Sequence, residues 1–135
     1  MLKLIIGVKG TGKTKQLIQM VHDALASTNG DVVCIEKGDK LRFDVNYRCR
    51  LIDTEYYGVC DADALYGFVA GILASNHDVT DLFIDSALKI CKDDTTAFDK
   101  FIAVVDELTA KANVNCVITS SLPAESASAT VQKYL

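Results

Sequence analysis

The sequence contains no tryptophan, a single proline and only two histidines among its 135 residues. Half of the residues are hydrophobic, a composition that excludes a collagen-like or disordered chain and is typical of a globular protein. No apolar run approaches the roughly 18 residues that span a bilayer, and the apolar start, Met1–Gly7, is too short for a secretory signal. We therefore predict a single cytoplasmic domain over residues 1–135 that contacts no membrane.

Disulfide and zinc-binding patterns are also missing. The five cysteines are odd in number and widely spaced, and none forms a C-x-x-C pair. We therefore expect reduced, mostly buried thiols that behave as small hydrophobic side chains.

Positive charge is scarce in this chain. Fourteen basic residues face eighteen acidic ones, and the net charge of −4 disfavours a broad nucleic-acid-binding surface. The one basic concentration, Lys37–Arg50 (KGDKLRFDVNYRCR), holds all three arginines. This segment could contact a nucleic acid, a partner or the nucleotide of a neighbouring subunit. The simpler interpretation is a solvated loop.

Short apolar runs alternate with amphipathic segments along the whole chain. Strands are predicted at 2–6, 32–36, 47–53, 81–85 and 114–119, and the alternating polarity of 47–53 favours an edge position. Helices are predicted from Lys13 to about Ser27, after a cap at Asp61, after a cap at Asp94 or Thr95, and as a short helix in the tail 123–135. This alternation predicts an α/β fold of three layers, α/β/α, with a mostly parallel sheet of about five strands.

The most specific motif follows the first predicted strand directly. It matches G-x-x-x-x-G-K-S/T, the Walker A pattern of phosphate-binding loops, and it opens an amphipathic helix. Glycines let consecutive backbone N–H groups point at phosphate oxygens, and the helix adds the positive end of its dipole. The lysine can reach the β- and γ-phosphates, and the threonine hydroxyl can ligate Mg²⁺. The candidate nucleotide-binding residues are Gly7, Val8, Lys9, Gly10, Thr11, Gly12, Lys13, Thr14 and Lys15.

A carboxylate at the end of another predicted strand completes the candidate metal site. Asp85 ends the run LFID, and the carboxyl ends of parallel strands meet at one edge of a sheet. Mg²⁺ on a triphosphate uses a carboxylate of this kind, so Thr14 and Asp85 are the candidate metal ligands. The alternative is that Asp85 simply caps a turn.

Together these motifs resemble P-loop NTPases of the RecA-like branch, over most of the chain. RecA-like and KaiC-like ATPases commonly have Asp-Ser where this chain has Asp85-Ser86, and take a water-orienting glutamate from the end of the second strand. The resemblance therefore implies Lys13, Asp85 and Glu36 as catalytic residues, with Glu36 as the general base, although Glu36 also fits a strand-end carboxylate paired with a lysine. Thr119 or Ser120 would lie next to the γ-phosphate. The loop GxxGTGKTK also resembles small ATP-binding proteins sometimes labelled PilT-like.

The resemblance also implies a sheet order. We expect the strands in the order 47–53, 32–36, 81–85, 114–119 and 2–6. The strand before the phosphate loop then lies at an edge that the C-terminal segment or a partner must cover.

The expected function is binding of ATP with Mg²⁺ and slow hydrolysis, coupled to an unidentified protein partner or to self-association. A guanine-specific GTPase is disfavoured because the chain has no N-K-x-D motif. Two alternatives stay open. One is a nucleotide-dependent switch without turnover, favoured by the serine after Asp85. The other is a small-molecule kinase, disfavoured because the few arginines form no clamp around several phosphates.

Overall fold

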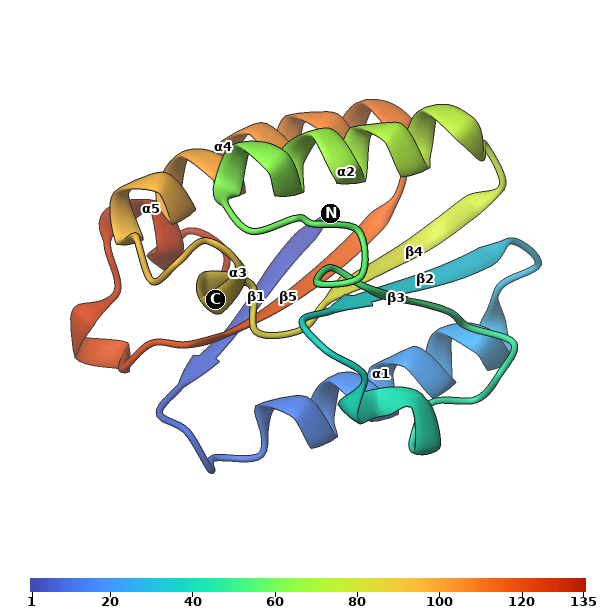
Figure 1. Ribbon diagram of the computed structural model, residues 1–135, viewed down its shortest axis with the longest axis horizontal. Coiled ribbons are helices and arrows are strands. Elements are labelled where there is room, and N and C mark those ends of the chain that lie inside the picture. Colours follow the sequence, from blue (N-terminus) through green and yellow to red (C-terminus); the bar gives the residue numbers. More distant parts are fainter.

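Five parallel strands form the central layer of this computed structural model, which describes all 135 residues (Figure 1). The strands are β1 (Leu2–Gly7), β2 (Asp31–Glu36), β3 (Arg50–Asp53), β4 (Val79–Ile84) and β5 (Asn115–Ser121). The long helices are α1 (Lys13–Ser27), α2 (Ala62–Ser75) and α4 (Thr95–Ala112). The short helices are η1 (Lys40–Phe43), α3 (Ala87–Ile90), η2 (Ala124–Ser126) and α5 (Ala129–Gln132). None of the helices is long and apolar enough to cross a bilayer.

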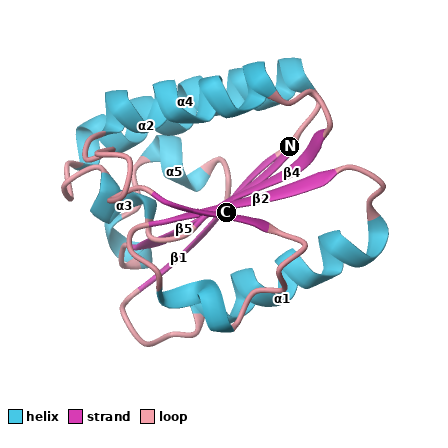
Figure 2. Ribbon diagram, turned by 45° about the vertical axis from the view of Figure 1, so that its right-hand side comes forward, coloured by secondary structure: helices cyan, strands magenta, loops and turns pink.

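Helices cover both faces of the sheet, as predicted. Figure 2 shows α1 on one face and α2 with α4 on the other. The larger core, of 26 buried residues, includes Phe98 and Phe101 from α4 and Leu65 from α2, and the smaller core, of 11, includes Leu17 and Val21 from α1. The predicted caps hold, because Asp61 accepts from the Ala64 N–H and Asp94 from the Ala97 N–H. The predicted three-layer α/β/α fold is confirmed.

The strand order is β1-β5-β4-β2-β3, as predicted. No strand lies outside β1, whose exposed edge meets the C-terminal segment instead. The Leu4 N–H donates to the Tyr134 carbonyl oxygen at 2.8 Å, and the Tyr134 hydroxyl donates to Asp106 of α4 at 2.7 Å. The C-terminal turn therefore covers the middle of this edge, and the phosphate-loop strand needs no second strand beside it.

Two local predictions need correction. The strand predicted at 47–53 begins only at Arg50, because Asn46 organises a turn before it: its carbonyl accepts the Cys49 N–H and its side chain accepts the Arg48 N–H. No helix was predicted at 87–90, where α3 lies, or at 40–43, where η1 lies. Both short helices are at the carboxyl edge of the sheet and contribute walls to the site described below.

The cysteines agree with the expectation of reduced, mostly buried thiols. All five are free, and only Cys60 is exposed. Burial raises the pKa of the Cys91 and Cys116 thiols to about 12 and that of Cys49 to about 11. These three side chains therefore stay protonated and unreactive at neutral pH.

Candidate functional site

The predicted phosphate loop connects β1 to α1 at the carboxyl edge of the sheet. Gly10 and Gly12 have φ angles of +88° and +86°, a left-handed conformation that favours glycine. Gly12 is the N-cap of α1, and neither a side-chain cap nor an acidic residue in the first turn occupies the helix N-terminus. The first amides of α1 are therefore available to an anion, at the positive end of the helix dipole.

The lysine of the motif lies over the loop that precedes it. Lys13 Nζ donates to the Val8 carbonyl oxygen at 2.9 Å, and Thr11 Oγ1 donates to the same oxygen at 2.8 Å. A lysine ammonium has three donors, so this contact holds Lys13 above the loop and leaves donors for phosphate oxygens. Thr11 also lies close to Gly7, where an added Cβ would come within 2.8 Å of Thr11 Oγ1.

Asp85 contacts two of the predicted residues, Thr14 and Thr119. It follows β4 directly, its side chain is buried, and its own N–H donates to the Ile35 carbonyl oxygen of the neighbouring strand. Its Oδ1 accepts a hydrogen bond from Thr14 Oγ1 at 3.2 Å and one from Thr119 Oγ1 at 2.8 Å. Thr119, at the end of the adjacent strand, also accepts the Ser86 N–H at 2.9 Å. The carboxylate is thus fixed in orientation beside the threonine that ends the phosphate loop.

These oxygen atoms fit part of a Mg²⁺ coordination shell. Mg²⁺ on a triphosphate typically takes one or two protein oxygens and completes its octahedron with phosphates and water. Thr14 and Asp85 supply a hydroxyl and a carboxylate in contact with each other. No group of three or more His, Cys, Asp or Glu side chains could hold a metal by itself.

A cleft of about 450 Å³, which we call the phosphate cleft, lies above the loop and Asp85. It contains only one hydrophobic lining residue, Leu41. Lys40 of η1 and Lys89 of α3 line it, and neither was singled out as a site residue in the sequence analysis. No sequence motif marks these two lysines. The lining residues are Lys9, Gly10, Gly12, Lys13, Thr14, Lys15, Lys40, Leu41, Asp85, Ser86, Lys89 and Ser121.

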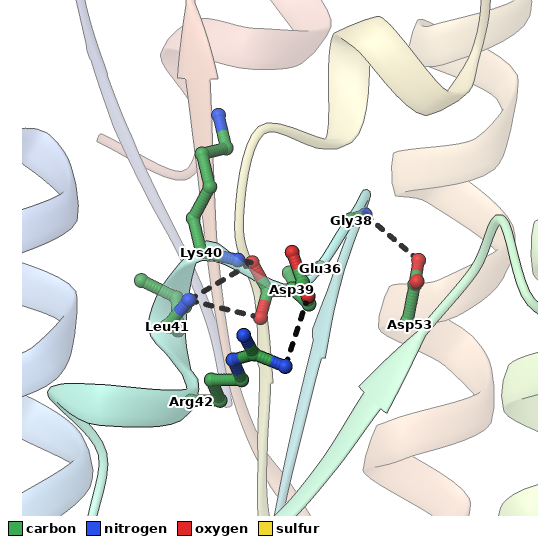
Figure 3. Close-up of polar contacts among 7 residues, drawn as sticks. All are labelled: Glu36, Gly38, Asp39, Lys40, Leu41, Arg42 and Asp53. Atoms are coloured by element: carbon green, nitrogen blue, oxygen red, sulfur yellow. Dashed lines mark hydrogen bonds and ion pairs between the residues drawn. The ribbon is translucent and has the colours of Figure 1, made fainter.

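Glu36 does not line this cleft. Figure 3 shows its carboxylate turned toward the start of η1: Oε1 accepts the Lys40 N–H at 3.1 Å and Oε2 accepts the Leu41 N–H at 3.1 Å. The side chain is only 2% exposed. Its geometry is that of a carboxylate that anchors the segment following β2, not one aimed at a water molecule in the cleft. It is not paired with Lys37 or Lys40 either, because the only ion pair in the chain joins Arg42 to Asp39 at 3.3 Å.

A different glutamate faces the site. Glu55, in the loop after β3, lines a pocket of about 370 Å³ together with Asp85 and Ser86. Glu36 was the predicted general base because it ends the second strand, whereas Glu55 lies two residues beyond the third. That position on an edge-strand loop carries no motif, so only the folded chain brings Glu55 to the site.

The anchoring role of Glu36 leads to a prediction about pH. Burial raises the pKa of the Glu36 carboxyl above its ordinary value, although the N–H donors of Leu41 and Lys40 act in the opposite direction. The folded state therefore binds this proton more tightly than the unfolded state. The contribution of Glu36 to stability is largest below the unfolded pKa of about 4.3 and falls as pH rises through the folded pKa.

Relative to Glu36→Gln, the wild-type protein should thus lose unfolding free energy as pH rises from about 4 toward neutrality. Urea unfolding of both proteins at several pH values measures this difference. A difference that is constant, or that grows with pH, would contradict the raised pKa.

The comparisons with known proteins concern the fold. No protein-family profile and no curated protein sequence matches the chain. Among solved structures, a KaiC-like protein from the hyperthermophilic archaeon Pyrococcus horikoshii OT3 is similar, with a TM-score of 0.71 and 15% sequence identity. The match covers 98% of this chain and 66% of that protein, so this chain spans slightly less than two thirds of its length. The predicted RecA-like fold is confirmed, whereas the resemblance to PilT-like proteins rests on the loop sequence alone.

Proposed function

We propose that this protein binds ATP together with Mg²⁺ in the phosphate cleft and hydrolyses it slowly. The observation that carries the proposal is the contact between Thr14 and Asp85, because it joins the end of the phosphate loop to a buried carboxylate from another strand. A glycine-rich turn without a nucleotide would not need this pairing. The RecA-like fold supports the same proposal by placing both residues at the carboxyl edge of the sheet.

Each residue has a separate task in this proposal. The amides of the loop and of the first turn of α1 hold the phosphate oxygens, and Lys13 neutralises charge on the β- and γ-phosphates. Thr14 and Asp85 would hold Mg²⁺, which offsets phosphate charge when bound. Thr119 positions the Asp85 carboxylate through the hydrogen bond of 2.8 Å. Lys40 and Lys89 face the cleft and would stabilise the charge that develops on the γ-phosphate.

Hydrolysis also needs a group that orients water. We propose Glu55 for this role, because it shares a pocket with Asp85 and Ser86 while both oxygens of Glu36 accept backbone N–H groups. A water held by Glu55 would attack the γ-phosphorus, the bond to the β–γ bridging oxygen would break, ADP would leave, and the Glu55 carboxylate would take the proton. The Glu55 side chain is exposed and makes no hydrogen bond, which is consistent with slow turnover.

Isothermal titration calorimetry with ATP and GTP, in Mg²⁺ and in EDTA, tests binding. We expect saturable binding of ATP that Mg²⁺ strengthens; absence of binding by both nucleotides would contradict the proposal. Phosphate release under steady state tests hydrolysis. If ATP binds but no phosphate is released, even with candidate partners or at concentrations that favour self-association, the protein is a nucleotide-dependent switch.

The pair Glu55→Gln and Glu36→Gln tests the choice of glutamate. We expect Glu55→Gln to lower turnover by about a hundredfold while ATP affinity is retained, which is the low end of the effect of removing a general base. Glu36→Gln should change turnover less, because it acts only through η1. The opposite result, in which only Glu36→Gln abolishes turnover with binding retained, would restore Glu36 as the general base.

A further inference from the structure

The phosphate cleft continues along the carboxyl edge of the sheet into two further pockets. The first, of about 370 Å³, shares Lys40, Asp85, Ser86 and Lys89 with the cleft. The second, of about 350 Å³, shares Lys37, Glu55 and Lys89 with the first, and we call it the outer pocket. Because they share lining residues, the three hollows lie next to one another, and we call this row of hollows the trough; it runs from the phosphate loop to the loops that follow β3 and α3.

Lysines line the whole length of this trough. Seven of the eleven lysines of the chain face one of its three parts. None of them forms an ion pair, since Arg42–Asp39 is the only pair within 4.0 Å. The chain as a whole has a net charge of −4, so these lysines concentrate positive charge on a protein that is negatively charged overall. Three carboxylates, those of Asp39, Glu55 and Asp85, also line the trough, so its seven lysines leave an excess of positive charge that raises the local concentration of anions. The seven lysines are Lys9, Lys13, Lys15, Lys37, Lys40, Lys89 and Lys92.

The backbone around α3 is also unusual. Four residues other than glycine have a positive φ angle, and three of them flank this four-residue helix: Ser86 at 56°, Lys92 at 58° and Asp93 at 58°. Such conformations are unfavourable for residues with a Cβ and are concentrated at functional sites. Here they form the segment that carries Lys89 and Lys92 at the wall of the outer pocket.

We propose that the outer pocket binds a small organic phosphate beside the nucleotide. This inference rests on the proposed function, because the nucleotide fills the phosphate cleft and leaves the outer pocket for a different ligand. Lys37 and Lys92, which do not line the phosphate cleft, bind the phosphate group of the ligand. Glu55 accepts a hydrogen bond from a hydroxyl of the ligand in place of the water that it holds during hydrolysis.

The outer pocket fits a small molecule better than a polymer. Its volume suits a ligand of sugar-phosphate size, and the side chains of Val59 and Ile90 offer apolar walls to a carbon skeleton. A continuous nucleic-acid backbone would bring further phosphates against Glu55 and against the net negative surface. A hydroxylated phosphomonoester satisfies both the lysines and the carboxylate.

Ribose 5-phosphate is a suitable probe, with ribose as its uncharged counterpart. The protein is first saturated with Mg²⁺ and a non-hydrolysable ATP analogue, which blocks the phosphate cleft, and the probe is then titrated while backbone amides are followed by NMR. We expect saturable shifts at the amides of the outer pocket, such as Gly58, Cys60 and Lys92, and no such shifts with ribose. Lys92→Gln, a change confined to the outer pocket, should weaken probe binding roughly tenfold and leave affinity for the ATP analogue unchanged.

Lys100→Gln is the matched control, since this exposed lysine lies on α4 and lines none of the three pockets. The inference is overturned if the nucleotide binds but the probe causes no saturable shifts, if ribose binds as tightly as its phosphate, or if Lys100→Gln weakens the probe as much as Lys92→Gln. Failure of the nucleotide itself to bind in the first step would instead contradict the proposed function.

Discussion

Replacing Lys13 by alanine should lower the affinity for ATP by about a hundredfold, which corresponds to about 2.7 kcal/mol. Lys13 is the charged side chain that the loop itself holds over the phosphate position, through its bond of 2.9 Å to the Val8 carbonyl oxygen. A hydrogen bond to a charged group contributes about 1.5–3 kcal/mol, and Lys13 would contact more than one phosphate. The loss should exceed that for any other single lysine of the trough.

The fold should survive this change. Lys13 is only half-buried and its one hydrogen bond is local to the loop, so the midpoint of thermal unfolding without nucleotide should move by only a few degrees. Lys3→Ala is the matched control, because Lys3 is an exposed lysine on the strand that leads into the same loop. Calorimetry of wild type, Lys13→Ala and Lys3→Ala measures the effect. If Lys13→Ala binds ATP as the wild type does, the phosphate-loop assignment is wrong.

Asp85→Ala should remove the dependence of ATP binding on Mg²⁺. In wild type we expect Mg²⁺ to strengthen binding by at least tenfold, since Asp85 and Thr14 supply the protein part of its coordination shell. In the variant, affinity with Mg²⁺ should fall toward the value in EDTA. Affinity in EDTA should stay the same or increase, because the substitution removes a negative charge near the phosphates. A substitution that lowers ATP affinity with Mg²⁺ but not in EDTA distinguishes a metal ligand from an aspartate with a purely structural role.

Asp81→Ala is the control for this second experiment. Asp81 lies on the same strand, β4, but toward its other end, where it accepts a hydrogen bond from Thr80. Its substitution should leave the effect of Mg²⁺ on ATP affinity unchanged. Asp85→Asn adds a further check, because it keeps the size of the side chain and much of its hydrogen bonding to Thr119 but not its charge. If Asp85→Ala and wild type respond equally to Mg²⁺, Asp85 is not a metal ligand.

The phosphate loop and the strand order were both predictable from the sequence. The loop spans consecutive residues, and its shape depends on local backbone angles that Gly10 and Gly12 make accessible. The strand order followed from the resemblance to RecA-like P-loop NTPases, which the loop and Asp85 together indicate. The position of Asp85 beside Thr14 then followed from the parallel sheet, in which carboxyl ends meet at one edge.

The acidic and basic side chains around the loop were less predictable. Glu36 ends β2 and Glu55 follows β3, both at the carboxyl edge of the sheet. The sequence does not indicate which of the two carboxylates accepts hydrogen bonds from backbone N–H groups. In the fold, η1 presents the amides of Lys40 and Leu41 to Glu36 and so turns it away from the cleft. Because η1 is a short helix with no periodic pattern, neither this helix nor its effect on Glu36 was predicted.

The sequence alone therefore determined the loop that would hold phosphate, the threonine and aspartate beside it, and the layers that support them, since these depend on local backbone geometry and on strand polarity. Only the tertiary structure decided which glutamate lines the pocket next to the phosphate cleft. It also decided that lysines from the phosphate loop, from the segment after β2 and from the segment around α3 line one trough. The physical reason is that these lysines are far apart in sequence. Their proximity depends on how loops and short helices pack at the edge of the sheet, and no local pattern of residues records that packing.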